Sequence, residues 1–171
     1  MRTLGLGRTN ESRFIHERIG FQYRMTNLTA AIGTAQMEHA AEAVAAKVAI
    51  ARRYDEALRG IPGLTLPPTQ PWATNVFWVY GILIEDEFGL SRVEVMRKLE
   101  KLGIETRTFF YPSHRQKFFP PISDAESAAR FPVSDRLGDP GLYIPSYIGM
   151  GDDVIGRVAD AIRSARATDS P

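Results

Sequence analysis

Residues 27–60 restrict the possible folds of this chain more than any other segment. The stretch NLTAAIGTAQMEHAAEAVAAKVAIARRYDEALRG is rich in Ala, Glu, Lys and Arg, which favour helix. Thr26 or Asn27 can cap its first turn, and Gly60 and Pro62 end it. The pattern predicts one helix of about nine turns. Its apolar positions recur at helical spacing and are Leu28, Ile32, Ala35, Val44, Val48, Ala51, Tyr54 and Leu58.

The remaining pattern predicts three strands with helices that cover them, an α/β sandwich. The strands are expected at 75–85 (NVFWVYGILIE), 104–110 (IETRTFF) and 141–145 (GLYIP), after a proline-rich connector at 63–75. Helices are expected at 91–103, 131–138 and 151–167. The first of these has a capping box, Ser91 with Glu94, and an apolar face of Val93, Met96, Leu99 and Leu102.

The N-terminal half of the long helix lacks a partner in this scheme. The helix is longer than a three-stranded sheet can cover. The first 25 residues likewise have no predicted helix or strand on which to pack. Gly33 lies inside the helix and costs about 1 kcal/mol relative to alanine, which indicates a closely packed neighbour. We therefore expect something outside this chain to pack on that end.

Composition excludes several function classes. The chain has 21 basic and 20 acidic residues, so no overall field recruits nucleic acid or an anionic membrane. It has no cysteine, and its apolar stretches of about ten residues are far shorter than the roughly 20 that a membrane helix needs. The start, MRTLGLGRTNESRF, lacks a signal-peptide core. From the lack of cysteine and of a signal-peptide core we expect a cytoplasmic protein. The three histidines are far apart in sequence, so we expect no metal site.

The segment GFQYRM, residues 20–25, places two aromatics, an amide and a guanidinium directly before the helix cap. Phe21 and Tyr23 could be core aromatics, with Arg24 a surface charge. Alternatively, the amide and guanidinium form an anion site at the helix N-terminus, for which phosphate is the natural ligand. The residues alone leave both interpretations open.

A second unusual stretch, TRTFFYPSHRQKFFP, covers residues 106–120 and follows a predicted strand. Cations alternate with aromatics in it, which suits an anion or sugar cleft, a nucleic-acid surface or an irregular apolar loop. The nearly neutral net charge makes the nucleic-acid surface the weakest of the three.

Together, the two stretches resemble the C-terminal part of the DegT/DnrJ/StrS family of sugar aminotransferases. PPTQPWATNVFWVYGI, GIETRTFFYPSHRQ, FPVSDRL and GLYIPSYIGM are similar to further family blocks, and TRTFFYPSHRQ is most similar to perosamine-synthase-like members. The family pattern G-[FY]-N-Y-R-M-[TS]-x-[LIM]-x-A-A-[IL]-G-x-x-Q-[LM] is met by Gly20, Phe21, Tyr23, Arg24, Met25, Thr26, Leu28, Ala30, Ala31, Ile32, Gly33, Gln36 and Met37.

The resemblance implies a fold-type I enzyme that uses pyridoxal 5'-phosphate, held as a Schiff base on a lysine in a larger N-terminal domain. Lys47, Lys98, Lys101 and Lys117 lack the surroundings of the family lysine motif, so we expect this chain to begin after that motif. No catalytic residue is assigned, and neither covalent cofactor binding nor activity is expected from this chain alone. The expected parts are an interface and active-site segment (1–26), a long connecting helix (27–60) and a small α/β domain (61–171).

The resemblance also implies roles for particular residues. Gln22 and Arg24 occupy family positions that reach the cofactor site of the neighbouring subunit, although the family has asparagine where this chain has the longer Gln22. The residues expected to border the substrate are Tyr23, Arg107, Phe110, Tyr111 and His114.

The implied parent reaction moves an amino group, typically from glutamate, to a nucleotide-linked keto-sugar for polysaccharide or glycoside biosynthesis. The expected partner is a second copy or a full-length relative. Two alternatives remain: a fragment of a related sugar dehydratase, in which histidine replaces the lysine, and a non-catalytic truncated or interaction module.

Overall fold

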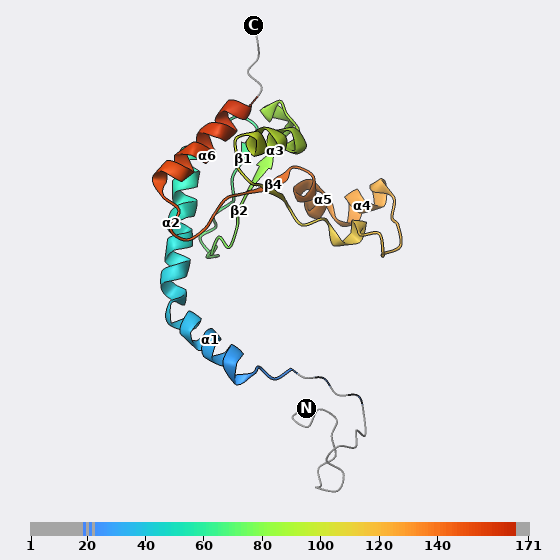
Figure 1. Cartoon of the computed structure of the whole chain (residues 1–171). Coiled ribbons are helices and arrows are strands. Elements are labelled where there is room, and N and C mark those ends of the chain that lie inside the picture. The colour runs from blue at the N-terminus through green and yellow to red at the C-terminus, as the bar shows by residue number, and fades with distance from the viewer. Residues whose placement is uncertain (1–18, 20, 22, 167–171) are drawn as a thin grey trace. The chain divides into compact units, whose positions relative to one another are not determined.

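The computed structural model describes residue 19, residue 21 and residues 23–166 in two compact units, which divide after Ala40. Helix α1, Asn27–Glu38, belongs to the first unit (Figure 1). Thr26 caps it, because its hydroxyl accepts a hydrogen bond from the Thr29 backbone at 3.2 Å. The helix buries none of its residues, and Leu28 and Ile32 are 74% and 59% exposed. No described atom lies within 4 Å of a Cβ built on Gly33, so the close neighbour expected there does not come from the described residues.

The prediction of one continuous helix is wrong at a single residue. His39 adopts φ −104° and ψ 4°, and its backbone N–H donates to the carbonyls of Gln36 and Met37 as the C-cap of α1. Helix α2 then runs over Ala40–Leu58. Residues 37–41 contain neither glycine nor proline, so the sequence gives no stop signal at this point.

The second unit contains a four-stranded antiparallel sheet in the order β1-β2-β4-β3. Its strands are β1 (Leu64–Thr65), β2 (Tyr80–Ile84), β3 (Arg107–Thr108) and β4 (Gly141–Ile144). All three predicted strands are confirmed, though each is shorter than expected. Strand β1 lies in the connector and has only two residues, too few to show the alternation that identifies a strand in sequence.

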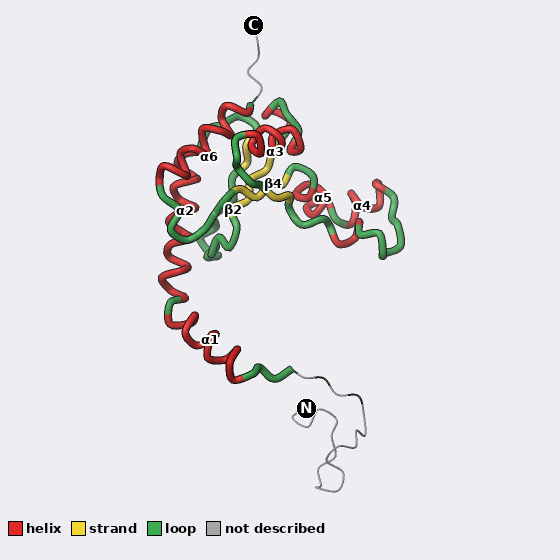
Figure 2. The backbone as a smooth tube through the Cα atoms, viewed as in Figure 1, coloured by secondary structure: helices red, strands yellow, loops and turns green. Residues whose placement is uncertain are grey.

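Helices α2, α3 (Arg92–Lys101) and α6 (Asp152–Ala165) pack with one face of the sheet into the core (Figures 1 and 2). Alternate residues of β2, Tyr80, Ile82 and Ile84, are at most 5% exposed and belong to this core. The predicted capping box of α3 is confirmed, with both reciprocal bonds present. Its buried residues are Leu99, as predicted, and Val95, whereas Val93 and Leu102 are about half exposed.

Polar side chains of α2 hold the segment between β4 and α6. Lys47 Nζ donates to the Ser146 carbonyl at 2.6 Å and to its hydroxyl, and Tyr54 Oη donates to the Pro145 carbonyl at 2.8 Å. Arg53 pairs with Asp152 at 2.7 Å. The bonds from Lys47 and Tyr54 satisfy backbone carbonyls of an irregular segment and tie it to α2, and the Arg53 pair ties the first residue of α6 to the same helix.

The chain between β3 and β4 forms short helices, η2 (Ser113–Arg115), α4 (Asp124–Arg130) and α5 (Pro132–Gly138). Helix α5 confirms the prediction at 131–138, whereas α4 was not predicted. A further short helix, η1 (Asp86–Phe88), follows β2. Within the described residues, no helix combines the length and the apolar character needed to span a membrane.

Candidate functional site

The described part of GFQYRM carries two exposed aromatics. Phe21 and Tyr23 are 60% and 78% exposed, and their rings stack with centroids 5.7 Å apart. Arg24 is also exposed and lies two residues before the Thr26 cap of α1. Gln22 falls outside the described residues, so its predicted role stays a prediction. The core interpretation of Phe21 and Tyr23 receives no support within the described residues, because both rings are exposed.

Among the predicted substrate-site residues of the second unit, Arg107 borders a different pocket from Tyr111 and His114. Arg107 is in the edge strand β3, and its guanidinium pairs with Glu105 at 3.3 Å. Phe110 is 72% exposed and stacks on Trp78 with centroids 6.4 Å apart. Tyr111 is 57% exposed, and His114 is turned into a polar network. Arg107 borders one pocket of about 300 Å³, and Tyr111 and His114 border another of about 470 Å³.

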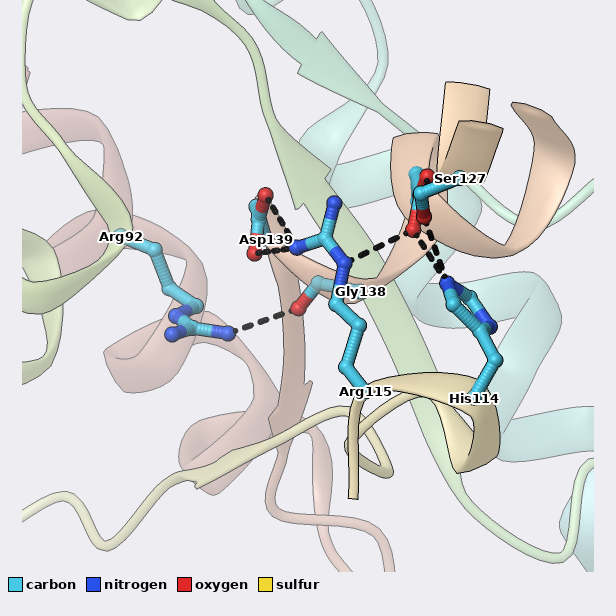
Figure 3. Close-up of polar contacts among 7 residues, drawn as sticks. Arg92, His114, Arg115, Ser127, Gly138 and Asp139 are labelled. Atoms are coloured by element: carbon cyan, nitrogen blue, oxygen red, sulfur yellow. Dashed lines mark hydrogen bonds and ion pairs between the residues drawn. The ribbon is translucent and has the colours of Figure 1, made fainter. Parts of the chain in front are cut away.

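The polar network around His114 joins η2 to α4 and α5 (Figure 3). His114 Nε2 lies 2.9 Å from Asp135 Oδ1 and 2.9 Å from Ser127 Oγ. Ser127 Oγ donates to Asp135 Oδ2 at 2.6 Å, and Arg115 Nε lies 2.9 Å from Asp135 Oδ1. Since a carboxylate only accepts, the imidazole must carry its proton on Nε2. Three donors therefore converge on Asp135.

This arrangement contains a serine, a histidine and an aspartate but is not built for nucleophilic catalysis. In a catalytic triad one imidazole nitrogen faces the serine while the other faces the carboxylate. Here the same nitrogen faces both, and Ser127 gives its proton directly to Asp135. Ser127 is only 3% exposed, and its hydroxyl proton is already engaged with Asp135. The network's visible effect is to fix η2 against α4 and α5.

The network makes stability depend on pH. The Ser127 hydrogen bond, followed by those of His114 and the charge of Arg115, holds the pKa of Asp135 below its ordinary value of 3.8. Because the pKa of Asp135 is lower in the folded than in the unfolded state, its ionised form stabilises the fold. This contribution is complete above pH 3.8 and is lost as the pH falls through the folded-state pKa. For Asp135→Asn we expect a lower free energy of unfolding than for wild type at pH 6. The difference between the two proteins should narrow steadily below pH 4.

Urea unfolding of both proteins from pH 6 down to pH 3 measures this gap. Asp139→Asn is the matched control, because Asp139 is 71% exposed and pairs with the outer end of Arg115, Nη1, at 3.3 Å. Asp139→Asn should lower the free energy of unfolding less than Asp135→Asn does at every pH. A gap between wild type and Asp135→Asn that stays constant down to pH 3 would contradict the assignment.

Sequence reasoning missed Ser127, Asp135 and Trp78 as parts of these sites. Ser127 and Asp135 lie 13 and 21 residues beyond His114, and no fixed spacing connects them. The predicted helix at 131–138 offered one weak signal, because it places Asp135 on a helix near the aromatic stretch. Trp78 lies in the stretch predicted as a buried strand, yet it is 71% exposed.

The described residues do not fit a covalent pyridoxal phosphate site. Lys47 Nζ is bonded to Ser146, and Lys98 Nζ donates to the Ala165 carbonyl at 2.9 Å. Lys101 and Lys117 are exposed, on α3 and after η2 respectively. Burial lowers the pKa of Lys47, but its amine is already engaged with the backbone. The described residues also contain no group of His, Asp and Glu side chains suited to a metal ion.

Comparison with known sequences finds one family over most of the chain. Residues 1–163 match the pattern of the DegT/DnrJ/EryC1/StrS aminotransferase family. The chain is 34% identical over 152 residues to GDP-perosamine synthase of Vibrio cholerae, covering 89% of this chain and 40% of that enzyme. It is 28% identical over 166 residues to dTDP-4-dehydro-2,6-dideoxy-D-glucose 3-dehydratase of Saccharopolyspora spinosa, covering 94% of this chain and 34% of the relative.

Solved structures share the fold. The aminotransferase TlmJ from Streptoalloteichus hindustanus superimposes with a TM-score of 0.78 at 23% identity, covering 95% of this chain and 42% of TlmJ. At this identity the likeness establishes the α/β fold alone. The chain thus spans about 40% of the length of the relatives it matches.

Proposed function

Because the chain belongs to the DegT/DnrJ/EryC1/StrS aminotransferase family, we propose that its residues form the C-terminal part of an enzyme that transfers an amino group to a nucleotide-linked keto-sugar. The 34% identity to GDP-perosamine synthase over nearly nine tenths of the chain is the observation that carries this proposal. The proposed substrate is a nucleotide-linked 4-keto-6-deoxy sugar, and the proposed amino donor is glutamate. Such products enter polysaccharide or glycoside biosynthesis, which we place in the cytoplasm.

The proposed location of the cofactor follows from the positions of the lysines. Pyridoxal phosphate supplies the electron sink for the amino transfer when it is bound. Because Lys47 and Lys98 are engaged in hydrogen bonds and Lys101 and Lys117 lie exposed, away from a site that fits the cofactor, we propose that the cofactor is held covalently by the part of the enzyme that these residues do not include. Residues 1–171 alone are then expected to be inactive. Gln22 is proposed to reach the cofactor phosphate of the neighbouring subunit in a dimeric assembly, and Arg24 to lie at the same cofactor site, near the charged group of the amino donor or substrate.

The residues proposed to border the sugar nucleotide are Tyr23, Arg107, Phe110 and Tyr111, together with His114. Of these, Arg107, Phe110 and Tyr111 have polar atoms or ring faces exposed to solvent. His114 has its Nε2 committed to Asp135 and Ser127, so we propose that it acts by fixing the position of η2.

A dehydratase is the second candidate, supported by the 28% identity to the S. spinosa enzyme over 94% of the chain. The aminotransferase is favoured because the identity to GDP-perosamine synthase is higher. The two reactions differ in product mass, since amino transfer replaces a carbonyl oxygen by an amine whereas dehydration removes water.

A chimera tests the proposed function. This chain replaces the matched segment of V. cholerae GDP-perosamine synthase, and the product from GDP-linked 4-keto-6-deoxy sugar and glutamate is identified by mass spectrometry. We expect the amino sugar from the chimera and no product from residues 1–171 alone. A folded chimera that contains pyridoxal phosphate but yields no amino sugar from GDP- or dTDP-linked keto-sugars would contradict the proposal.

Gln22→Asn in this chimera tests the cofactor contact. Asparagine is the residue of the family pattern at this position, so its shorter amide is expected to bind the cofactor phosphate equally well or up to about tenfold more tightly, as for one charge-assisted hydrogen bond. Fluorescence titration with pyridoxal phosphate measures the affinity. Clearly weaker binding would show that the glutamine, not the asparagine, fits this enzyme.

A further inference from the structure

Phe110 and Tyr111, two of the residues proposed to border the substrate, lie on a stretch without strand or helix. Strand β3 ends at Thr108, and the Phe109 N–H donates to the Gly141 carbonyl at 3.0 Å as the last backbone bond to the neighbouring strand. In the described part of the chain, residues 110 and 111 make no backbone hydrogen bond to another segment. Their positions must therefore depend on what holds the chain directly after them.

The turn that follows Tyr111, residues 112–115, packs on helix α5. Pro112 is buried, and its ring lies so close to Gly138 that a Cβ added to the glycine would come within 2.8 Å of Pro112 Cγ. At the other end of the turn, Arg115 Nε lies 2.9 Å from Asp135 Oδ1. Helix α5 thus holds the turn at its first and last residues.

His114 connects the same turn to α4. Its Nε2 lies 2.9 Å from Ser127 Oγ, and its ring stacks on that of Phe131, between α4 and α5, with centroids 4.3 Å apart. The Ser127 hydroxyl donates to Asp135 at 2.6 Å, so one carboxylate joins both helices to the turn. We call Ser127 and Asp135 the polar clasp.

The rest of the second unit holds α5 in place. Arg92 Nη1 of α3 donates to the Gly138 carbonyl at 3.0 Å (Figure 3), and two residues after Gly138 the chain enters β4 at Gly141. Because α5 is tied to a core helix and to the sheet, loss of the polar clasp is expected to free the turn rather than to move α5.

We propose that Ser127 and Asp135 are positioning residues for the sugar nucleotide, because they hold the turn 112–115 and thereby the Tyr111 side chain. This inference rests on the proposed function. The polar atoms of the clasp are engaged with each other and with the turn, whereas Tyr111 is 57% exposed. A substrate-binding side chain is effective only when supporting residues fix its position.

Steady-state kinetics of the chimera separate this role from a general loss of structure. For Ser127→Ala and Asp135→Ala we expect the KM for the sugar nucleotide to rise about fivefold or more, while kcat and the KM for glutamate stay within about twofold. Urea unfolding shows which variants are folded, and Ser127→Ala, which removes a single oxygen, decides if Asp135→Ala is not. An unchanged KM for the sugar nucleotide, or a loss confined to kcat, overturns the proposal.

Arg163→Ala is the control for lost stability. Like Ser127→Ala, it removes one hydrogen bond in which a partner is charged, here from the Arg163 guanidinium to the Ala57 carbonyl at 2.8 Å. That bond joins α6 to α2 and does not involve the turn 112–115. Arg163→Ala should leave kcat and both KM values within about twofold. A rise in the KM for the sugar nucleotide as large as that of Ser127→Ala would show a general effect of stability and overturn the proposal.

A double-mutant cycle tests whether Ser127 acts through Tyr111. In a chimera that already carries Tyr111→Ala, Ser127→Ala should raise the KM for the sugar nucleotide less than about twofold further, because no side chain remains to be positioned. Arg107→Ala is the matched background, because Arg107 borders a different pocket, and there Ser127→Ala should still raise this KM about fivefold. Equal effects in both backgrounds, or a wild-type KM for Tyr111→Ala alone, overturn the proposal.

Hydrogen exchange measures the hold on the turn without any activity. The Gln116 amide donates to the Ser113 carbonyl at 3.1 Å, so its exchange reports whether the turn stays closed. In residues 1–171 we expect Ser127→Ala to speed this exchange about fivefold or more. Glu126→Gln is the control, because it loses a pair with Arg130 within α4, at 2.6 Å, and should change the exchange less than about twofold. Equal exchange in Ser127→Ala and wild type overturns the proposal.

These readouts separate the positioning role from the proposed function. An active chimera in which Ser127→Ala leaves the KM for the sugar nucleotide unchanged refutes the positioning role and leaves the function in place. A folded chimera without amino-sugar product refutes the function, and hydrogen exchange then decides alone whether Ser127 holds the turn.

Discussion

Gly63→Ala is expected to lower the free energy of unfolding by about 3 kcal/mol or more. Gly63 has φ +71°, and an added Cβ would lie 1.9 Å from the backbone nitrogen of Phe88 and 2.5 Å from the Glu87 carbonyl carbon. The left-handed conformation costs about 1–2 kcal/mol for a residue with a Cβ, and forcing atoms into a packed site costs about 1–3 kcal/mol more. The neighbour is backbone, so no side chain can rotate to make room.

Gly60→Ala is the matched control for this prediction. Gly60 has nearly the same backbone conformation, φ +76°, but no atom lies within 4 Å of its added Cβ. Gly60→Ala should lower the free energy of unfolding by about 1 kcal/mol, because only the left-handed backbone conformation opposes the added Cβ. Urea unfolding followed by circular dichroism measures both changes. Equal losses for the two variants would show that the approach of η1 to Gly63 contributes nothing.

Arg24→Ala in the chimera is expected to lower kcat/KM for amino transfer about 10- to 100-fold. A charge-assisted hydrogen bond is worth about 1.5–3 kcal/mol, which corresponds to this range of rates. Arg24 is exposed and precedes the cap of α1, so its loss should leave the fold of the chain intact. Steady-state kinetics with glutamate and the sugar nucleotide measure the loss.

The control for Arg24 is Arg52→Ala, an exposed arginine of α2 that no predicted role involves. It should change kcat/KM less than twofold, and circular dichroism should be the same for all three proteins. Unchanged kinetics in Arg24→Ala would remove the arginine from the site.

The sequence predicted elements wherever a local signal exists. The Ser91 capping box, the end of α2 before Gly60 and the existence of strands β2 and β4 all follow from neighbouring residues. Strand β1 and the break at His39 were not predictable, because the first has two residues and the second lacks any stop signal. These features depend on contacts or backbone angles that no short window encodes.

The candidate site was predictable only as a set of unusual stretches. The aromatic and cationic residues at 106–120 were identified from composition, but composition could not separate the inward His114 from the exposed Phe110. That separation depends on Ser127 and Asp135, which reach His114 through α4 and α5. Likewise, the exposure of Trp78 follows from the positive φ of Phe77, which a run of β-branched and aromatic residues conceals.

Reduction with borohydride after incubation with pyridoxal phosphate, followed by intact-mass and peptide analysis, tests the central claim most directly. The claim is that these residues complete a sugar aminotransferase whose cofactor lysine lies elsewhere. We predict one equivalent of cofactor on the chimera, attached outside residues 1–171, and no stoichiometric adduct on residues 1–171 alone. A single-site, stoichiometric adduct on Lys47, Lys98, Lys101 or Lys117 would contradict the claim.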